Sequence, residues 1–130
     1  MRTVITFGTY DLFHIGHINL LKRASQLGDR LIVGISSDKM SFDKKQRYPI
    51  YNQDDRREIV ASLKWVSDTF LEESLDLKRS YLESHDADVL VMGDDWEGKF
   101  DQFKDLVDVV YLPRTQNIST TELIQVVKLL

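Results

Sequence analysis

The chain has 130 residues, of which 42% are hydrophobic and 29% charged, a composition that predicts an ordinary globular protein with one domain over residues 1–130. The absence of cysteine excludes disulfides, thiolate catalysis and thiolate metal sites, and the net charge of −4 argues against nucleic acid as a partner. The first apolar run is too short for a signal peptide and no later run approaches membrane-spanning length, so we expect a cytoplasmic protein without a membrane partner.

The predicted elements alternate between strands and helices. The first half of the chain contains, in order, a strand (Arg2–Gly8), a helix (Gly16–Leu27), a strand (Arg30–Ser36), a polar irregular segment (Ser37–Tyr51) and a helix from an N-cap at Asn52 to about Leu63. The second half contains a short strand (Thr69–Leu71), a helix (Leu77–His85), a strand (Asp88–Gly93), a short helix (Phe100–Leu106), a strand (Val109–Leu112) and a final helix (Thr120–Leu130).

This alternation predicts an α/β fold with a single doubly wound parallel sheet. Ligands of such sheets bind beyond the carboxyl ends of the strands, so the loops that follow strands should share one face of the molecule. These loops are Gly8–His17, Ser36–Tyr51, Gly93–Phe100 and Pro113–Thr120.

The first of these loops, "GTYDLFHIGH", contains two of the three histidines, His14 and His17, and ends at the start of a predicted helix. A helix N-terminus attracts phosphate, glycines allow a ligand close to the backbone, and imidazoles donate hydrogen bonds to phosphate oxygens. The alternative is a tight turn with two half-buried histidines. We favour the phosphate site because the pair lies at a strand-to-helix junction.

The last of these loops predicts a second helix N-terminus at the same face. Ser119 and Glu122 fit a capping box, with Ser119 as the N-cap. The guanidinium of Arg114 suits a phosphate or the edge of a base. Capping alone would explain Ser119 and Glu122, but not Arg114 and Thr115.

Three segments resemble a known family. Residues 9–17 resemble the GT(F/Y)DxxHxGH signature of the nucleotidyltransferase superfamily, in its cytidylyltransferase form. Val91–Asp101 and Leu112–Thr121 are similar to the corresponding segments of cytidylyltransferases that act on glycerol 3-phosphate for teichoic acid or capsule polymer synthesis. The resemblance implies a Rossmann-like nucleotidyltransferase fold. It also implies a reaction that joins CTP and glycerol 3-phosphate to give CDP-glycerol and pyrophosphate.

The resemblance also implies which residues form the site. His14, His17 and a lysine of the basic segment Lys39–Arg47 are catalytic; an extra residue in that segment leaves open whether the lysine is Lys44 or Lys45. The acceptor is bound by this lysine and by Lys78. The nucleotide is bound by Gly8, Thr9, Tyr10, Asp11, His14, Gly16, His17, Arg47, Asp94, Arg114, Thr115, Ile118, Ser119, Thr120 and Thr121.

The sequence departs from the family pattern at two further positions. Asn117 replaces a glycine, and because asparagine tolerates a positive φ, the turn is expected to survive. Lys64 replaces an arginine of the family. It keeps the positive charge but cannot make the bidentate contact of a guanidinium.

The expected chemistry requires no general base, because the acceptor phosphate is already an anion near neutral pH. Catalysis then consists of positioning and neutralisation of charge, with Mg²⁺ arriving on CTP and no metal site built from protein side chains alone. We also expect a homodimer.

Several alternatives remain open from the sequence. In a second interpretation the acceptor is phosphocholine, phosphoethanolamine or another polyol phosphate. For a cationic headgroup, an aromatic cage would be formed by Tyr48, Tyr51 and Trp96. A third reading is a nucleotide-binding regulatory module without turnover. "HIGH" followed by "KMS" is also similar to the signatures of class I aminoacyl-tRNA synthetases, but the chain is too short and too acidic for that class.

Overall fold

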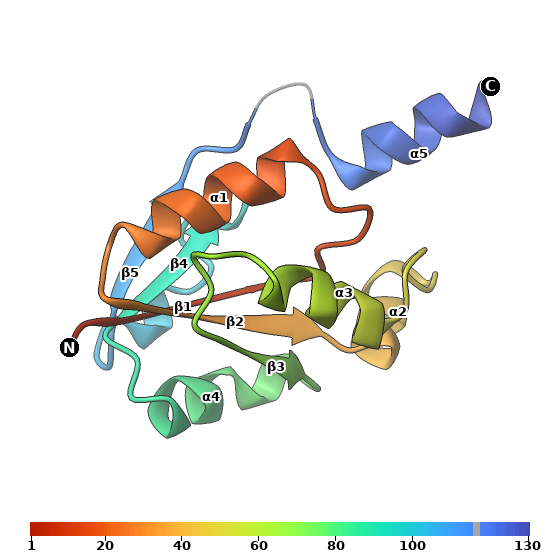
Figure 1. The fold of residues 1–130 in the computed structure, drawn as a ribbon. Helices are drawn as coiled ribbons and strands as arrows, with labels where there is room; N and C mark the ends of the chain where they lie inside the picture. Colours follow the sequence, from red (N-terminus) through yellow and green to blue (C-terminus); the bar gives the residue numbers. More distant parts are fainter. Residues whose placement is uncertain (116–117) are drawn as a thin grey trace.

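The computed structural model describes residues 1–115 and 118–130, and contains one five-stranded, all-parallel sheet (Figure 1). The strand order is β3-β2-β1-β4-β5. The strands are β1 (Thr3–Gly8), β2 (Arg30–Ser36), β3 (Asp68–Glu72), β4 (Val89–Gly93) and β5 (Asp108–Leu112). The predicted doubly wound parallel sheet is confirmed, and all five predicted strands are present within two residues of their expected ends.

Alternating side chains of the buried strands face two separate cores. Val4 of β1 packs toward α1 (Ile15–Ser25) and α3 (Gln53–Ala61), whereas Ile5 and Phe7 pack toward α4 (Lys78–Ser84) on the other face. Figure 1 shows α1 and α4 on opposite sides of the sheet. Because both faces are covered, β2 is apolar along nearly its whole length, as the sequence indicated.

Two predicted segments differ from the structure. The segment Ser37–Tyr51, expected to be irregular, contains α2 (Asp38–Lys45), whose N-cap Ser37 accepts a hydrogen bond from the Met40 amide. This helix is polar and buries little, so it lacks the apolar periodicity from which a helix is recognised. Conversely, the short helix expected over Phe100–Leu106 is only a 3₁₀ turn, η3 (Asp101–Phe103).

The last helix, α5 (Thr120–Lys128), begins after the predicted N-cap Ser119 and projects from the body of the molecule (Figure 1). The Ser119 hydroxyl accepts from the Glu122 amide at 3.1 Å, which is the forward half of the predicted capping box. Asn117, where a turn was expected to survive, lies outside the described residues. Across residues 1–115 and 118–130, none of the helices has the length and apolar character needed to cross a membrane.

Candidate active site

A cavity of about 390 Å³ lies at the carboxyl ends of the strands and receives all the loops that the sequence placed on that face. Its lining includes every predicted site residue except Asp94. The predicted residues that line it are Gly8, Thr9, Tyr10, Asp11, His14, Gly16, His17, Lys44, Lys45, Arg47, Lys78, Arg114, Thr115, Ile118, Ser119, Thr120 and Thr121. Asp94 and Asp95 share a 3₁₀ turn, η2 (Asp94–Trp96), and Asp95 rather than Asp94 faces the cavity.

The two histidines of the first loop lock each other in place. His14 is the N-cap of α1, and its Nδ1 accepts from the Gly16 amide at 3.1 Å. The Nδ1 of His17 accepts from the His14 amide at 3.2 Å, and the two rings stack with centroids 3.8 Å apart. Because each Nδ1 is an acceptor, the proton of each neutral ring must lie on Nε2. Both imidazoles therefore offer an Nε2–H donor.

Burial keeps these rings neutral. Desolvation, reinforced by the charge that His14 would carry, lowers the pKa of His17 to about 3. Desolvation also lowers the pKa of His14. Near neutral pH the pair consequently acts as two oriented N–H donors, and not as two cations.

The structure explains two residues of the first loop, Gly16 and Tyr10. A Cβ on Gly16 would lie 2.8 Å from Cε1 of His14, so a side chain there would displace the ring that caps the helix. Tyr10 and Leu12 have φ of 55° and 46°, in the left-handed region that non-glycine residues adopt at a cost. The buried ring of Tyr10 meets the His17 ring edge-on at 5.2 Å, and thereby supports the histidine from behind.

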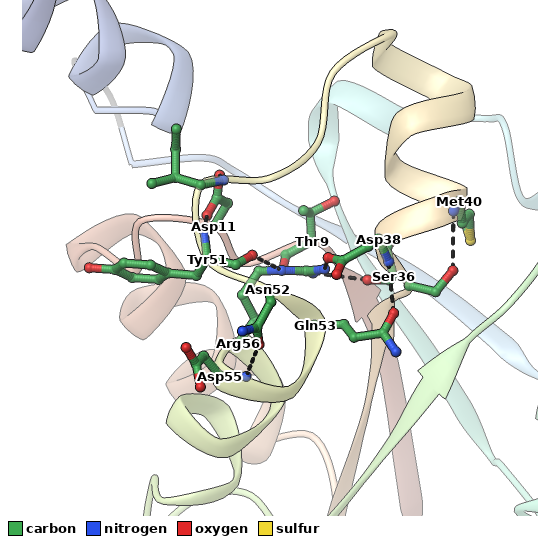
Figure 2. A network of polar contacts seen from close by, with 12 residues as sticks. Thr9, Asp11, Ser36, Asp38, Met40, Tyr51, Asn52, Gln53, Asp55 and Arg56 are labelled. Atoms are coloured by element: carbon green, nitrogen blue, oxygen red, sulfur yellow. Dashed lines mark hydrogen bonds and ion pairs between the residues drawn. The ribbon is translucent and has the colours of Figure 1, made fainter.

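Asp11 holds the first loop to the segment before α3. Its carboxylate accepts from the Ile50 amide at 2.7 Å and the Tyr51 amide at 2.9 Å (Figure 2). Its own carbonyl accepts from the Thr120 hydroxyl at 2.7 Å, which joins the start of α5 to the same loop. Both carboxylate oxygens thus have a structural use, and a contact between Asp11 and the nucleotide stays a prediction.

Arg56 of α3 is the centre of the network in Figure 2 and is fully buried. Its guanidinium donates to the carbonyls of Thr9, Ser36 and Tyr51 at 2.8 to 3.0 Å, and pairs with the Asp38 carboxylate at 2.7 Å. These acceptors belong to the loop after β1, the end of β2, the start of α2 and the segment before α3. One side chain therefore fixes the relative position of two cavity walls.

The end of the cavity near β5 and α5 carries Arg114 and the first turn of α5. The Thr115 hydroxyl accepts from the Asn19 side chain of α1 at 2.9 Å, and its own proton remains able to donate. Thr120 and Thr121 of the first turn of α5 line the cavity, and the first amides of a helix attract an anion there.

The opposite end, near β3 and α2, carries three lysines. Lys44 and Lys45 are the last residues of α2 and both line the cavity. Consecutive helical side chains lie about 100° apart, so two neighbouring residues can both face it. Partial burial lowers the pKa of Lys44, the Glu72 carboxylate raises it, and the ammonium groups of Lys78 and Lys45 lower it.

Lys78 lies deeper, at the start of α4, and forms an ion pair with Glu72 at 2.8 Å. Its ammonium is 3.9 Å from the centroid of the Phe7 ring and 5.1 Å from that of Phe100. Burial lowers the pKa of Lys78, and the negative charge of Glu72 partly opposes that shift.

Two residues singled out in the sequence, Lys64 and Tyr51, lie outside the cavity lining. Lys64 is exposed, with its ammonium 5.6 Å from the Trp65 ring, and does not line the cavity. Tyr48 and Trp96 line the cavity, but Tyr51 faces a separate hollow beside α3, so the predicted three-residue aromatic cage is not assembled.

Sequence reasoning missed Arg56 and Glu72. Arg56, Val60 and Leu63 share the spacing of one helical face, so a charged residue on an apolar face was the signal for Arg56. Glu72 is the last residue of β3, one position beyond the predicted end of that strand, and therefore points to the ligand face.

The family model described as Cytidylyltransferase-like matches residues 5–126. The chain is 48% identical over 123 residues to "Glycerol-3-phosphate cytidylyltransferase" of Bacillus subtilis, covering 95% of each chain. It is 45% identical to "Glycerol-3-phosphate cytidylyltransferase" of Staphylococcus aureus, covering 96% of this chain and 94% of that one.

A solved structure supports the fold. The "lipopolysaccharide core biosynthesis protein from Thermoplasma volcanium GSS1" aligns with 89% of this chain and 99% of its own, with a TM-score of 0.76 and 24% sequence identity.

Proposed function

The chain belongs to the cytidylyltransferase-like family, and from this premise we propose that it joins CTP and glycerol 3-phosphate to give CDP-glycerol and pyrophosphate. The observation that carries the proposal is the locked pair of neutral imidazoles, His14 and His17, between two cationic ends of one cavity. Such a site suits a reaction between two anions, because each end holds one anion and the imidazoles serve the charge that develops between them.

The reaction is a displacement at the α-phosphorus of CTP. An oxygen of the acceptor phosphate forms the new P–O bond, the bond to the β-phosphate breaks, and pyrophosphate leaves with the electron pair. His14 and His17 donate from Nε2 to triphosphate oxygens, while Lys44 and Lys45 bring the acceptor phosphate against the nucleotide. The chain needs no general base, since the attacking phosphate carries its own charge.

We assign the nucleotide to the end formed by Arg114, Thr115 and the first turn of α5, and the acceptor to the end formed by Lys44, Lys45 and Lys78. The assignment follows from the distribution of groups. Arg114 and the α5 amides suit planar bases and phosphates, whereas the lysines act as compact point charges for a small phosphate.

Magnesium enters the proposal with the nucleotide. Among residues 1–115 and 118–130, no three His, Asp or Glu side chains gather in a way that would hold a metal ion, and the Asp11 carboxylate is engaged by backbone amides. A Mg²⁺ ion carried by triphosphate oxygens needs few protein ligands and, when bound, neutralises part of the triphosphate charge. Asp95, an exposed carboxylate that lines the cavity, would help to hold such an ion.

The wider setting is also proposed. CDP-glycerol would serve teichoic acid or capsule synthesis in the cytoplasm, and the chain would act as a homodimer. A nucleotide-binding module without turnover is the competing class, and the complete set of histidines and lysines in the cavity argues against it. The incomplete aromatic cage disfavours phosphocholine as acceptor.

Pyrophosphate release tests the proposal directly. CTP and ATP are each combined with glycerol 3-phosphate, phosphocholine and phosphoethanolamine, with Mg²⁺ present, and turnover is compared. We expect CTP with glycerol 3-phosphate to give the highest kcat/KM. Turnover with none of the acceptors, alongside measurable CTP binding by calorimetry, would instead identify a regulatory module.

A further inference from the structure

Glu72 occupies an unusual place for a carboxylate. It is the last residue of β3, 1% exposed, and lines the acceptor end of the cavity. Its Oε2 lies 2.8 Å from Nζ of Lys78, which is itself 3% exposed. Among residues 1–115 and 118–130, Oε2 accepts no hydrogen bond, so its contact with Lys78 is an ion pair and Oε2 keeps its capacity to accept one.

Stability alone gives a weak reason for this pair. The Lys78 ammonium lies against the faces of Phe7 and Phe100, in apolar surroundings where an apolar pair of similar size would serve as well. A buried charge pair that also faces a ligand cavity instead suggests recognition.

The charges around Glu72 decide which ligand group suits it. Lys44 and Lys78 both lie near the Glu72 carboxylate, so this end of the cavity holds more positive than negative charge. A cationic headgroup is disfavoured because the carboxylate already has its cation. The acceptor phosphate is repelled by Glu72 and belongs toward Lys44 and Lys45.

A hydroxyl fits between the two members of the pair, because it donates to a carboxylate and accepts from an ammonium at once. We propose that Glu72 is a specificity-determining residue that accepts a hydrogen bond from a hydroxyl of an uncharged polyol phosphate acceptor. This inference rests on the proposed cytidylyltransferase function and names the part of the acceptor that the site recognises.

The test pairs an enzyme change with a substrate change. Glycerol 3-phosphate is compared with n-propyl phosphate, which has the same three-carbon chain and no hydroxyl, at saturating CTP. The wild-type chain should favour glycerol 3-phosphate in kcat/KM by about a hundredfold or more, because a site built for a hydroxyl rejects the analogue that lacks it. Equal use of the two phosphates by the wild-type chain would overturn the inference while leaving the proposed function standing.

Glu72→Gln then assigns the preference to this side chain. It should lower kcat/KM for glycerol 3-phosphate about tenfold or more and change that for n-propyl phosphate less than about threefold. The matched control is Glu73→Gln, the same change at the exposed neighbouring residue, which should leave both values within about twofold. An equal loss for both acceptors in Glu72→Gln would show a merely structural role and overturn the proposal.

Circular dichroism decides whether Glu72→Gln is folded. If it is not, Glu72→Asp keeps the charge and withdraws it by one methylene, and should reduce the preference for glycerol 3-phosphate at least about threefold. An unchanged preference in Glu72→Asp would overturn the inference. Failure of the wild-type chain to turn over any phosphate acceptor with CTP would refute the proposed function itself.

Discussion

The two loops that supply the reacting groups are built in opposite ways. The loop after β1 is held by the reciprocal bonds of His14 and His17, by the stack of their rings and by the Asp11 carboxylate. The segment after β2 ends in Lys44 and Lys45, exposed side chains on the last turn of a short polar helix. The donors are therefore oriented before substrate binds, whereas the lysines can adjust to it.

This difference suits the proposed chemistry. Hydrogen-bond donors contribute to the transition state only when their direction is fixed, since donors that must reorient lose that advantage. A compact ammonium on a long stem neutralises charge from many positions, so its direction matters less. Arg56 joins the two regions, because it bonds to Thr9 in the first and to Ser36 and Asp38 in the second.

The largest effect is expected at Arg56, where a substitution breaks both regions at once. Arg56→Ala leaves three carbonyls and the Asp38 carboxylate without their buried partner, and should lower the free energy of unfolding by about 3–5 kcal/mol. Urea unfolding followed by circular dichroism measures the loss. The control is Arg57→Ala, an exposed neighbour that bonds to the Thr69 hydroxyl and carbonyl and should cost much less. Similar losses in the two variants would contradict the role of Arg56.

His17→Ala tests the loop after β1 alone. It removes an Nε2–H donor and the acceptor for the His14 amide, and should lower kcat about a hundredfold or more. Steady-state pyrophosphate release measures kcat. The residue is half-buried, so some loss of stability is also expected.

His85→Ala is the control for His17→Ala. This third histidine stacks on Phe70, outside the cavity lining, and its loss should leave kcat within about twofold. A folded His17→Ala variant with a near-normal kcat would refute the role of the pair.

The same contrast explains what the sequence could and could not predict. The first loop was recognisable because glycines and histidines at the end of a strand indicate a phosphate site, and the bonds between them are local in sequence. The helix α2 escaped detection because it is polar and because the bond of Asp38 to Arg56, which holds its start, joins distant residues and leaves no periodic pattern. The inward turn of Asp95 in place of Asp94 likewise depends on a single turn geometry.

Lys44→Ala and Lys45→Ala test the two lysines at the end of α2. The charges of Glu72 and Lys78 act on Lys44, so we expect its loss to lower kcat/KM for glycerol 3-phosphate about tenfold, the value of a charge-assisted contact. Loss of Lys45 should lower kcat/KM for glycerol 3-phosphate about threefold or less, because the charge of Lys44 remains to bind the acceptor phosphate. A larger effect at Lys45 would reverse the assignment, and two equally active variants would show that neither lysine meets the substrate.

The smallest expected effect concerns pH and belongs to the locked region. Burial lowers the pKa of His17 to about 3 in the folded chain, against about 6.5 in the unfolded chain, so between these pH values the unfolded state binds the extra proton. The free energy of unfolding therefore carries no penalty from His17 above pH 6.5. As the pH falls toward 3, it decreases by up to about 1.4 kcal/mol per pH unit. Replacement by a residue that does not titrate removes this slope. The difference in unfolding free energy between the wild-type chain and His17→Gln should therefore shrink by about 1 kcal/mol between pH 7 and pH 5.5. Urea unfolding at both pH values measures it, and a constant difference would mean that His17 is not held neutral by burial.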